Sequence, residues 1–133
     1  MAFKAELSFK DSNNVYAVFE CDYDFQQEID ITGKPSGKPK PGIVSVLFES
    51  KADKDMVQWM FSPGNVRSGQ IDFYSDESKE KKIKTLAFNN AICVGLQDRF
   101  SSSGSLPMLT TIRFVAEKLT LDGVDYKANW THF

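Results

Sequence analysis

The longest alternation of apolar and polar residues runs through residues 86–121 and predicts one long β-hairpin. On its first arm the residues expected on the buried face are Leu86, Phe88, Ile92, Val94 and Leu96. On its second arm they are Met108, Ile112, Phe114 and Ala116. The other face of the first arm would then carry the small residues Ala87, Ala91, Cys93 and Gly95. A chain with such long strands is expected to form a wall or a shell.

Shorter alternations predict strands at residues 3–10, 17–26, 43–49 and 67–75. In the second of these, the residues expected to face the core are Ala17, Phe19, Cys21, Tyr23 and Phe25. The opposite face carries Glu20, Asp22 and Asp24, together with Val18 and Gln26. One side of this strand is therefore expected to be buried and the other wet.

One short helix is expected between the strands. Residues 50–53 match a capping box, and Met56, Trp59 and Met60 then follow at helical spacing, so the helix should end near Phe61. The tail after Asp122-Gly123 should turn, and Trp130 and Phe133 could pack back onto the body. The pattern predicts a single domain over residues 1–133, mainly β: a small β-barrel or sandwich of about seven to eight strands with one short α-helix and a long loop.

The long loop lies after the second strand, where glycines and prolines exclude both a helix and a central strand. Its residues are Thr32, Gly33, Lys34, Pro35, Ser36, Gly37, Lys38, Pro39, Lys40, Pro41 and Gly42. The segment fails as a phosphate-binding loop, because its glycines are too closely spaced and Pro39 follows the second lysine. Its three lysines have no local acid, so docking on an acidic surface is favoured over an idle exposed loop.

Charge and composition exclude several classes of protein. The 133 residues have a formal net charge of -2, which disfavours a nucleic-acid partner or attraction to an anionic membrane. No apolar run approaches the ~18 residues of a membrane span, and the first residues lack the plan of a signal peptide. We therefore expect synthesis and folding in the cytosol without direct membrane insertion. Cys21 and Cys93 are then expected to be buried free thiols.

Candidate catalytic chemistry is sparse. The single histidine, His132, lies next to the C-terminus, which argues against a catalytic triad and against a zinc site. Glu20, Asp22 and Asp24 are spaced about 6.5 Å apart along one strand face and could hold a cation or act as an acid and base. A solvated or lumen-facing acidic surface is favoured, because no second acidic segment converges on it. We expect no enzyme, no metal and no cofactor.

An ordered set of motifs resembles the Hcp (TssD) tube proteins of type VI secretion systems, in particular the Bacteroidetes branch. The set runs through Cys21-Asp22-Tyr23, Asp30-x-Thr32-Gly33-Lys34-Pro35-Ser36, Gly42, Leu86-x-Phe88-x-Asn90-Ala91, Pro107-Met108, Ala116-Glu117-Lys118 and the closing Asn129-Trp130. The resemblance implies a small β-barrel that forms homo-hexameric rings. It further implies that the rings stack into a tube inside a contractile sheath.

The same resemblance implies further partners and a route. The tube would meet the sheath, the baseplate and spike, and effector proteins, assembling in the cytoplasm and leaving through the apparatus without a signal peptide. It implies no enzymatic activity, and contacts between subunits and rings made by residues 32–42. This loop departs from the family pattern in being rich in Lys-Pro.

Two other functions stay open at this point. A monomeric β-sandwich could bind a small molecule or glycan through exposed aromatic residues, and it would show a monomer in light scattering with a saturable ligand shift. A hydrolase using Asp22 and Asp24 ranks far behind.

Overall fold

The computed structural model describes residues 4–27, 29–37, 40–75, 81–105 and 108–128. Its strands are β1 Lys4–Phe9, β2 Val15–Asp22, β3 Phe25–Gln26, β4 Lys40–Pro41, β5 Val44–Glu49, β6 Val66–Tyr74, β7 Lys82–Phe100, β8 Met108–Leu121 and β9 Val124–Lys127; its helix is α1 Asp55–Phe61. Several residues used above lie outside the described ranges: Phe3, Lys38, Pro39, Pro107, Asn129, Trp130, His132 and Phe133. The side chains of residues 40 and 41 are also outside the description.

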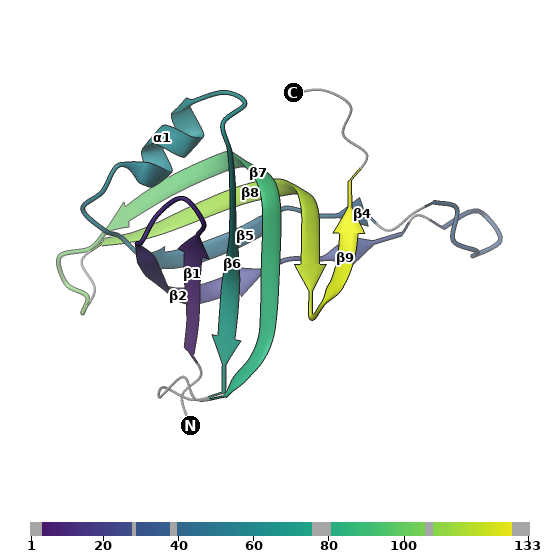
Figure 1. Ribbon diagram of the computed structural model, residues 1–133, viewed down its shortest axis with the longest axis horizontal. Coiled ribbons are helices and arrows are strands. Elements are labelled where there is room, and N and C mark those ends of the chain that lie inside the picture. The colour runs from purple at the N-terminus through teal and green to yellow at the C-terminus, as the bar shows by residue number, and fades with distance from the viewer. Residues whose placement is uncertain (1–3, 28, 38–39, 76–80, 106–107, 129–133) are drawn as a thin grey trace.

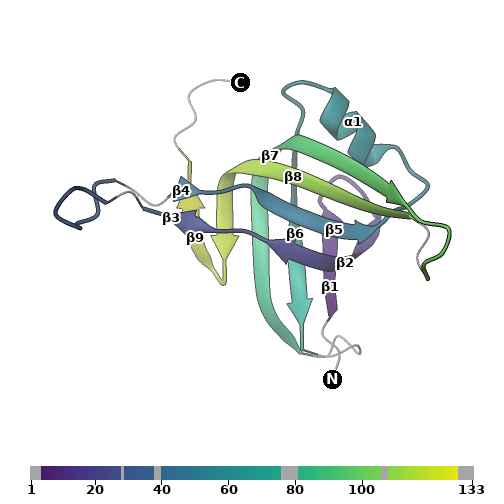
Figure 2. The same ribbon diagram turned by 180° about the vertical axis from the view of Figure 1, so that it is seen from behind.

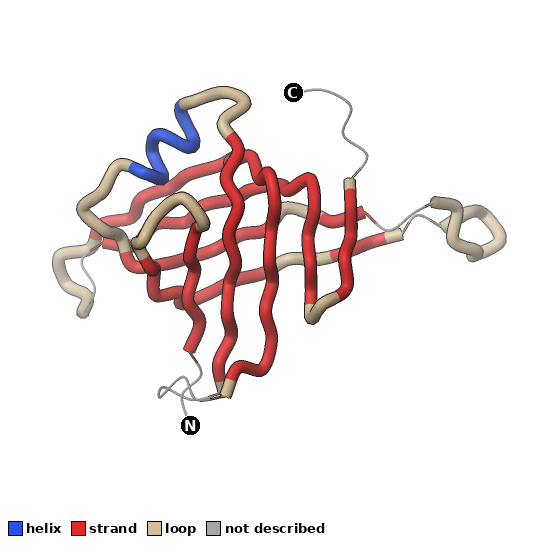
Figure 3. Tube along the Cα trace, viewed as in Figure 1, coloured by secondary structure: helices blue, strands red, loops and turns tan. Residues whose placement is uncertain are grey.

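The long strands form one closed barrel (Figure 1). Antiparallel neighbours follow the order β5-β2-β1-β6-β7-β8, and a further pairing of β5 with β8 closes the ring of strands. Strand β9 adds to the end of β8, and β3 pairs with β4 in a separate two-stranded sheet. The prediction of a mainly β fold with one short helix is confirmed, as a barrel rather than a sandwich. Figure 3 shows how little of the chain is helical.

The predicted hairpin exists, but the buried face of its first arm was assigned wrongly between Phe88 and Leu96. Ala91 and Cys93 are buried, whereas Val94 is 45% exposed. Arg67 and Gly69 of β6 pair with Ala91 and Phe88 of β7, so β7 has one extra residue between these two pairs. A second extra residue of β7, Val94, lies opposite β8. Each extra residue inverts which side chains face the core, so Ile92 and Val94 point away from it. Ala91 and Cys93 face the core instead, so the small residues do not form a separate outer face.

The second arm of the hairpin follows the prediction more closely. Ile112, Phe114 and Ala116 are buried, while Met108, at the start of β8, is 39% exposed. On β7, Leu96 returns to pack against the core after the second extra residue. The predicted alternation therefore holds on β8 from Ile112 to Ala116, whereas the expected burial of Met108 is wrong.

The same effect explains an error in β2. Tyr16 is buried and Val18 packs on the core, whereas Phe19 is 48% exposed. Val18 pairs with Phe48 and Glu20 with the adjacent Leu47, which leaves Phe19 as an extra residue. Ala17 and Phe19 were therefore wrongly assigned to the core. Beyond this point Cys21, Tyr23 and Phe25 pack on the core as expected.

The helix closes one side of the barrel (Figure 2). Met56 and Trp59 are buried, which confirms the predicted apolar face, and the Trp59 indole N–H donates to the Ala91 carbonyl at 3.1 Å. The capping box is wrong. Helix α1 begins at Asp55 with no side-chain cap from Lys54, and the Ser50 hydroxyl bonds the Thr110 hydroxyl at 2.5 Å.

The tail beyond β8 turns as predicted and adds a strand that was not predicted. Asp122 and Gly123 have φ angles of 52° and 83°, and two successive positive φ values give the tight turn that suits a β-hairpin. The returning strand β9 pairs with β8 from Leu121 to Lys118. Among the described residues no helix is long and apolar enough to cross a bilayer.

Candidate assembly surfaces

The predicted loop forms the tip and the returning strand of a hairpin that projects from the barrel. We call this hairpin, residues 25–41, the arm. Strand β3 leads out, β4 leads back, and Ile29 and Pro35 form an isolated bridge between them. Figures 1 and 2 show the arm extending beyond the barrel, on the side away from α1 and the far end of the β7–β8 hairpin. The residues 32–37 are exposed. Lys38 and Pro39 lie outside the described residues.

A carboxylate organises the tip of the arm. Asp30 Oδ1 accepts hydrogen bonds from the Thr32 hydroxyl at 2.6 Å, the Thr32 amide at 2.9 Å and the Lys34 amide at 3.1 Å. These bonds, led by the hydroxyl, hold the pKa of Asp30 below its usual value. Gly33 supplies a φ of 87°, which a residue with a Cβ adopts only with strain. The tip is therefore a built turn whose shape does not depend on burial.

Sequence reasoning missed the most informative residues of the arm. Ile29 is 68% exposed and Ile31 is fully exposed, on either side of Asp30. The available signal was their apolar character in a short alternating run, next to a segment already expected to dock. An aliphatic side chain presented this way is stabilised when a partner covers it, by about 1.5–3 kcal/mol for complete burial.

The acidic residues Glu20, Asp22 and Asp24 are all exposed. Asp24 is tied to the root of the arm, because its carbonyl accepts from the Gly42 amide at 2.8 Å and its Oδ2 accepts from the Gln26 amide group at 2.8 Å. A Cβ at position 42 would first meet the end of the exposed Asp24 side chain, which would have to turn away to make room. The structure thus joins one end of the predicted loop to one end of the acidic face.

The acidic face does not gather further ligands. Within the described ranges no group of three or more His, Cys, Asp or Glu side chains could hold a metal ion. Both cysteines are free, as predicted, with Cys93 buried and Cys21 half-buried. Burial raises the pKa of the Cys21 thiol to about 12, with a smaller contribution from the Asp22 charge. Cys21 is therefore a poor nucleophile at neutral pH.

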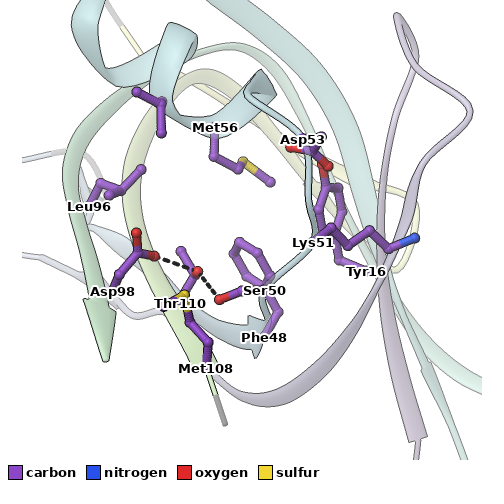
Figure 4. Close-up of a pocket in the computed structure, with 11 residues that line it drawn as sticks. Tyr16, Phe48, Ser50, Lys51, Asp53, Met56, Leu96, Asp98, Met108 and Thr110 are labelled. Atoms are coloured by element: carbon purple, nitrogen blue, oxygen red, sulfur yellow. Dashed lines mark hydrogen bonds between the residues drawn. The ribbon is translucent and has the colours of Figure 1, made fainter. Parts of the chain in front are cut away.

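A small cavity lies at the barrel end farthest from the arm, between α1 and the β7–β8 hairpin. Figure 4 shows the side chains of Met56, Leu96, Met108 and Phe48 around it. Asp98 accepts a hydrogen bond from Thr110 at 2.6 Å, and Asp53 accepts one from the Tyr16 hydroxyl at 2.8 Å. The cavity measures about 80 Å³ and combines an apolar lining with two carboxylates at its rim.

Comparison with known proteins gives a consistent result. The sequence model of the family described as Hemolysin coregulated protein Hcp (TssD) matches residues 1–131. A search of curated proteins finds no match to the chain.

Among solved structures, Hcp1 from Flavobacterium johnsoniae is similar over 94% of this chain and 99% of its own, with a TM-score of 0.82 and 23% identity. Hcp1 from Salmonella typhimurium is similar over 91% of this chain and 86% of its own, with a TM-score of 0.72 and 12% identity. A chain in the baseplate of the anti-feeding prophage is similar over 92% of this chain and 93% of its own, with a TM-score of 0.54 and 10% identity. At these identities the likeness to solved structures shows the fold.

Proposed function

Because the chain belongs to the Hcp (TssD) family, it is a structural subunit of the inner tube of a type VI secretion system, and we propose that it forms hexameric rings that stack through the arm. Its role as a tube protein of a secretion apparatus follows from the family. The monomeric small-molecule or glycan-binding alternative is not favoured.

The observation that carries the stacking role is the arm with its fully exposed Ile31. A hairpin that projects from a closed barrel has no core beneath its tip, so its apolar side chains face water in a single copy. A contact with another copy would bury them. A head-to-tail contact of this kind repeats without closing, which is what a tube needs.

We extend the proposal to partners and route. The rings would carry effector proteins and would contact the sheath and the baseplate or spike. The subunit would assemble in the cytoplasm and leave through the apparatus without a signal peptide. The acidic face formed by Glu20, Asp22 and Asp24 would line the lumen or meet the basic arm of a neighbour. Charge reversal at Asp22 would separate these two roles, because only the second role predicts weaker assembly.

Electron microscopy of the purified protein in negative stain tests the proposal. We expect ring-shaped particles with a central hole, and short stacks of rings at higher protein concentration. Particles that remain single chains at every concentration would contradict it.

A further inference from the structure

Two apolar features of unusual shape lie at opposite ends of the long axis of the molecule. One is the tip of the arm, which lies at one end of the molecule in Figure 1 and carries the fully exposed Ile31. The other is the cavity lined by Phe48, Met56, Leu96 and Met108 (Figure 4), which we call the mouth cavity. A projection and a hollow at opposite ends of one chain cannot meet within it, and a second copy arranged head to tail can bring them together.

We propose that the mouth cavity is the socket for the arm tip of a second copy in the adjacent ring, with Ile31 entering the cavity. The proposal rests on the proposed function and deepens it, because it names the residues on both sides of the ring-to-ring contact. Each copy would give one tip to one neighbour and receive one tip from another.

The size of the cavity suits an aliphatic side chain. A single water needs about 10–15 Å³ of such space, and a cavity of ~150 Å³ takes up benzene. The mouth cavity, at about 80 Å³, lies between these two cases. Two of its lining residues are methionines, Met56 and Met108, whose flexible thioether chains adapt to an incoming group.

The charges at the two surfaces are complementary. Asp53 and Asp98 stand at the rim of the cavity, and each already accepts a hydrogen bond from a neighbouring hydroxyl. The rim lysine, Lys51, places its ammonium 5.5 Å from the centre of the Tyr16 ring. On the arm, Lys34 is exposed three residues after Ile31, within the turn organised by Asp30. Insertion of Ile31 would bring both Lys34 and the Asp30 carboxylate to a rim that holds two carboxylates and one ammonium, so unlike charges can pair in one orientation of docking.

Two other apolar hollows fit this role less well. One is lined by Phe25, Leu119 and Val124, so it lies beside the root of the arm and on the same side of the molecule as the tip. The other is lined by Phe19, Tyr74 and Ile83, where β6 ends and β7 begins, on a flank of the barrel. Neither lies at the end of the molecule opposite the arm.

Cysteine cross-linking tests the contact in the assembled protein. We would combine Ile31→Cys with Val57→Cys, because Val57 lines the mouth cavity and is 37% exposed. A short bismaleimide should then link chains into a ladder of dimers, trimers and longer species. The control pair is Ile31→Cys with Val124→Cys, and we expect at least tenfold less cross-linked product from it. The natural cysteines provide the baseline, since burial raises the pKa of both thiols.

A charge placed at the tip gives a second readout. Ile31→Asp should leave rings intact and abolish their stacking, while Val124→Asp, at a residue 73% exposed on β9, should leave stacking unchanged. If rings stack but the Ile31–Val57 pair cross-links no better than its control, the socket is wrong and the proposed function stands. If the unmodified protein forms no rings, the proposed function fails and the socket with it.

Discussion

The barrel and the arm are built by opposite means. In the barrel every strand has a hydrogen-bonded partner on each side, and the rings of Phe9, Trp59, Phe88 and Phe114 pack against one another. The arm has a ladder of two residue pairs, one isolated bridge and a turn organised by Asp30, with Ile29 and Ile31 in solvent. The packed barrel therefore holds the fold, and the arm, which contributes little to the core, is the segment that we propose makes contacts with other copies. Substitutions should therefore affect stability in one region and assembly in the other.

The largest effect on stability is expected at Trp59. The centre of its ring lies 5.6 Å from those of Phe9 and Phe114 and its N–H donates to the Ala91 carbonyl, so Trp59→Ala leaves a cavity and removes that hydrogen bond. We expect a loss of about 3–5 kcal/mol in the free energy of unfolding, measured by urea denaturation. The control is Phe61→Ala in the same helix, where the side chain is 75% exposed. Equal losses in the two variants would refute this picture of the core.

The same substitution at two glycines compares the regions directly. A Cβ at Gly69, in β6, would collide with the Ser8 carbonyl and press on Phe88, while a Cβ at Gly37, in the arm, meets nothing within 4 Å. We expect Gly69→Ala to cost about 1–3 kcal/mol. Gly37→Ala should stay within about 0.5 kcal/mol of the parent protein. Thermal unfolding of both variants measures this difference. A Gly69→Ala variant as stable as the parent protein would contradict it.

An ion pair at the barrel end gives a smaller, pH-dependent effect. Arg67 is 6% exposed, its guanidinium lies 3.7 Å from the centre of the Phe9 ring, and its Nη2 donates to Asp11 at 2.9 Å. Asp11→Asn should cost about 1 kcal/mol at neutral pH, less than for a fully buried pair because the Asp11 side chain is 61% exposed.

The direction of the pH dependence follows from the same contact. The hydrogen bond from Arg67, aided by its charge, lowers the pKa of Asp11 from 3.8. This stabilisation is complete above pH 3.8 and is lost as the pH falls through the lower value of the folded protein. The stability difference between the parent protein and Asp11→Asn should therefore shrink as the pH falls below 3.8. A difference that is constant from pH 7 to pH 2 would show that the ion pair is not its source.

The smallest effect on stability is expected from the arm. Replacing residues 29–35 by two glycines removes exposed residues whose described hydrogen bonds lie within the arm, so the free energy of unfolding should change by no more than about 0.5 kcal/mol. Assembly should change completely, with rings that no longer stack. Stacks of normal length from this variant, in electron micrographs, would remove the role given to the arm.

Periodicity predicted the strands well, because the alternation of β8 through Ile112, Phe114 and Ala116 survives in the barrel. It failed where one strand gained a residue over its partner, at Phe19 and at Val94, because a bulge depends on the neighbouring strand and leaves no mark in the local pattern. Strand β9 was missed because Val124–Lys127 is short and mostly exposed. The signal for this strand in the sequence is the Asp122-Gly123 turn that precedes it.

The assembly surfaces were predicted in part. The glycines and prolines after Thr32 gave the position of a loop, but the outgoing strand and the exposed Ile29 and Ile31 were read only in the structure. The mouth cavity could not be foreseen, since it combines Met56 from α1 with Leu96 and Met108 from two strands. Such a cavity exists only after the barrel closes.

Native mass spectrometry of the unmodified protein beside the tip-replaced variant tests the central claim most directly. The account predicts that both proteins give a species of six chains, each near 15.0 kDa, and that only the unmodified protein gives higher multiples of that species. A single-chain mass for the unmodified protein at every concentration, or equal higher multiples from both proteins, would contradict it.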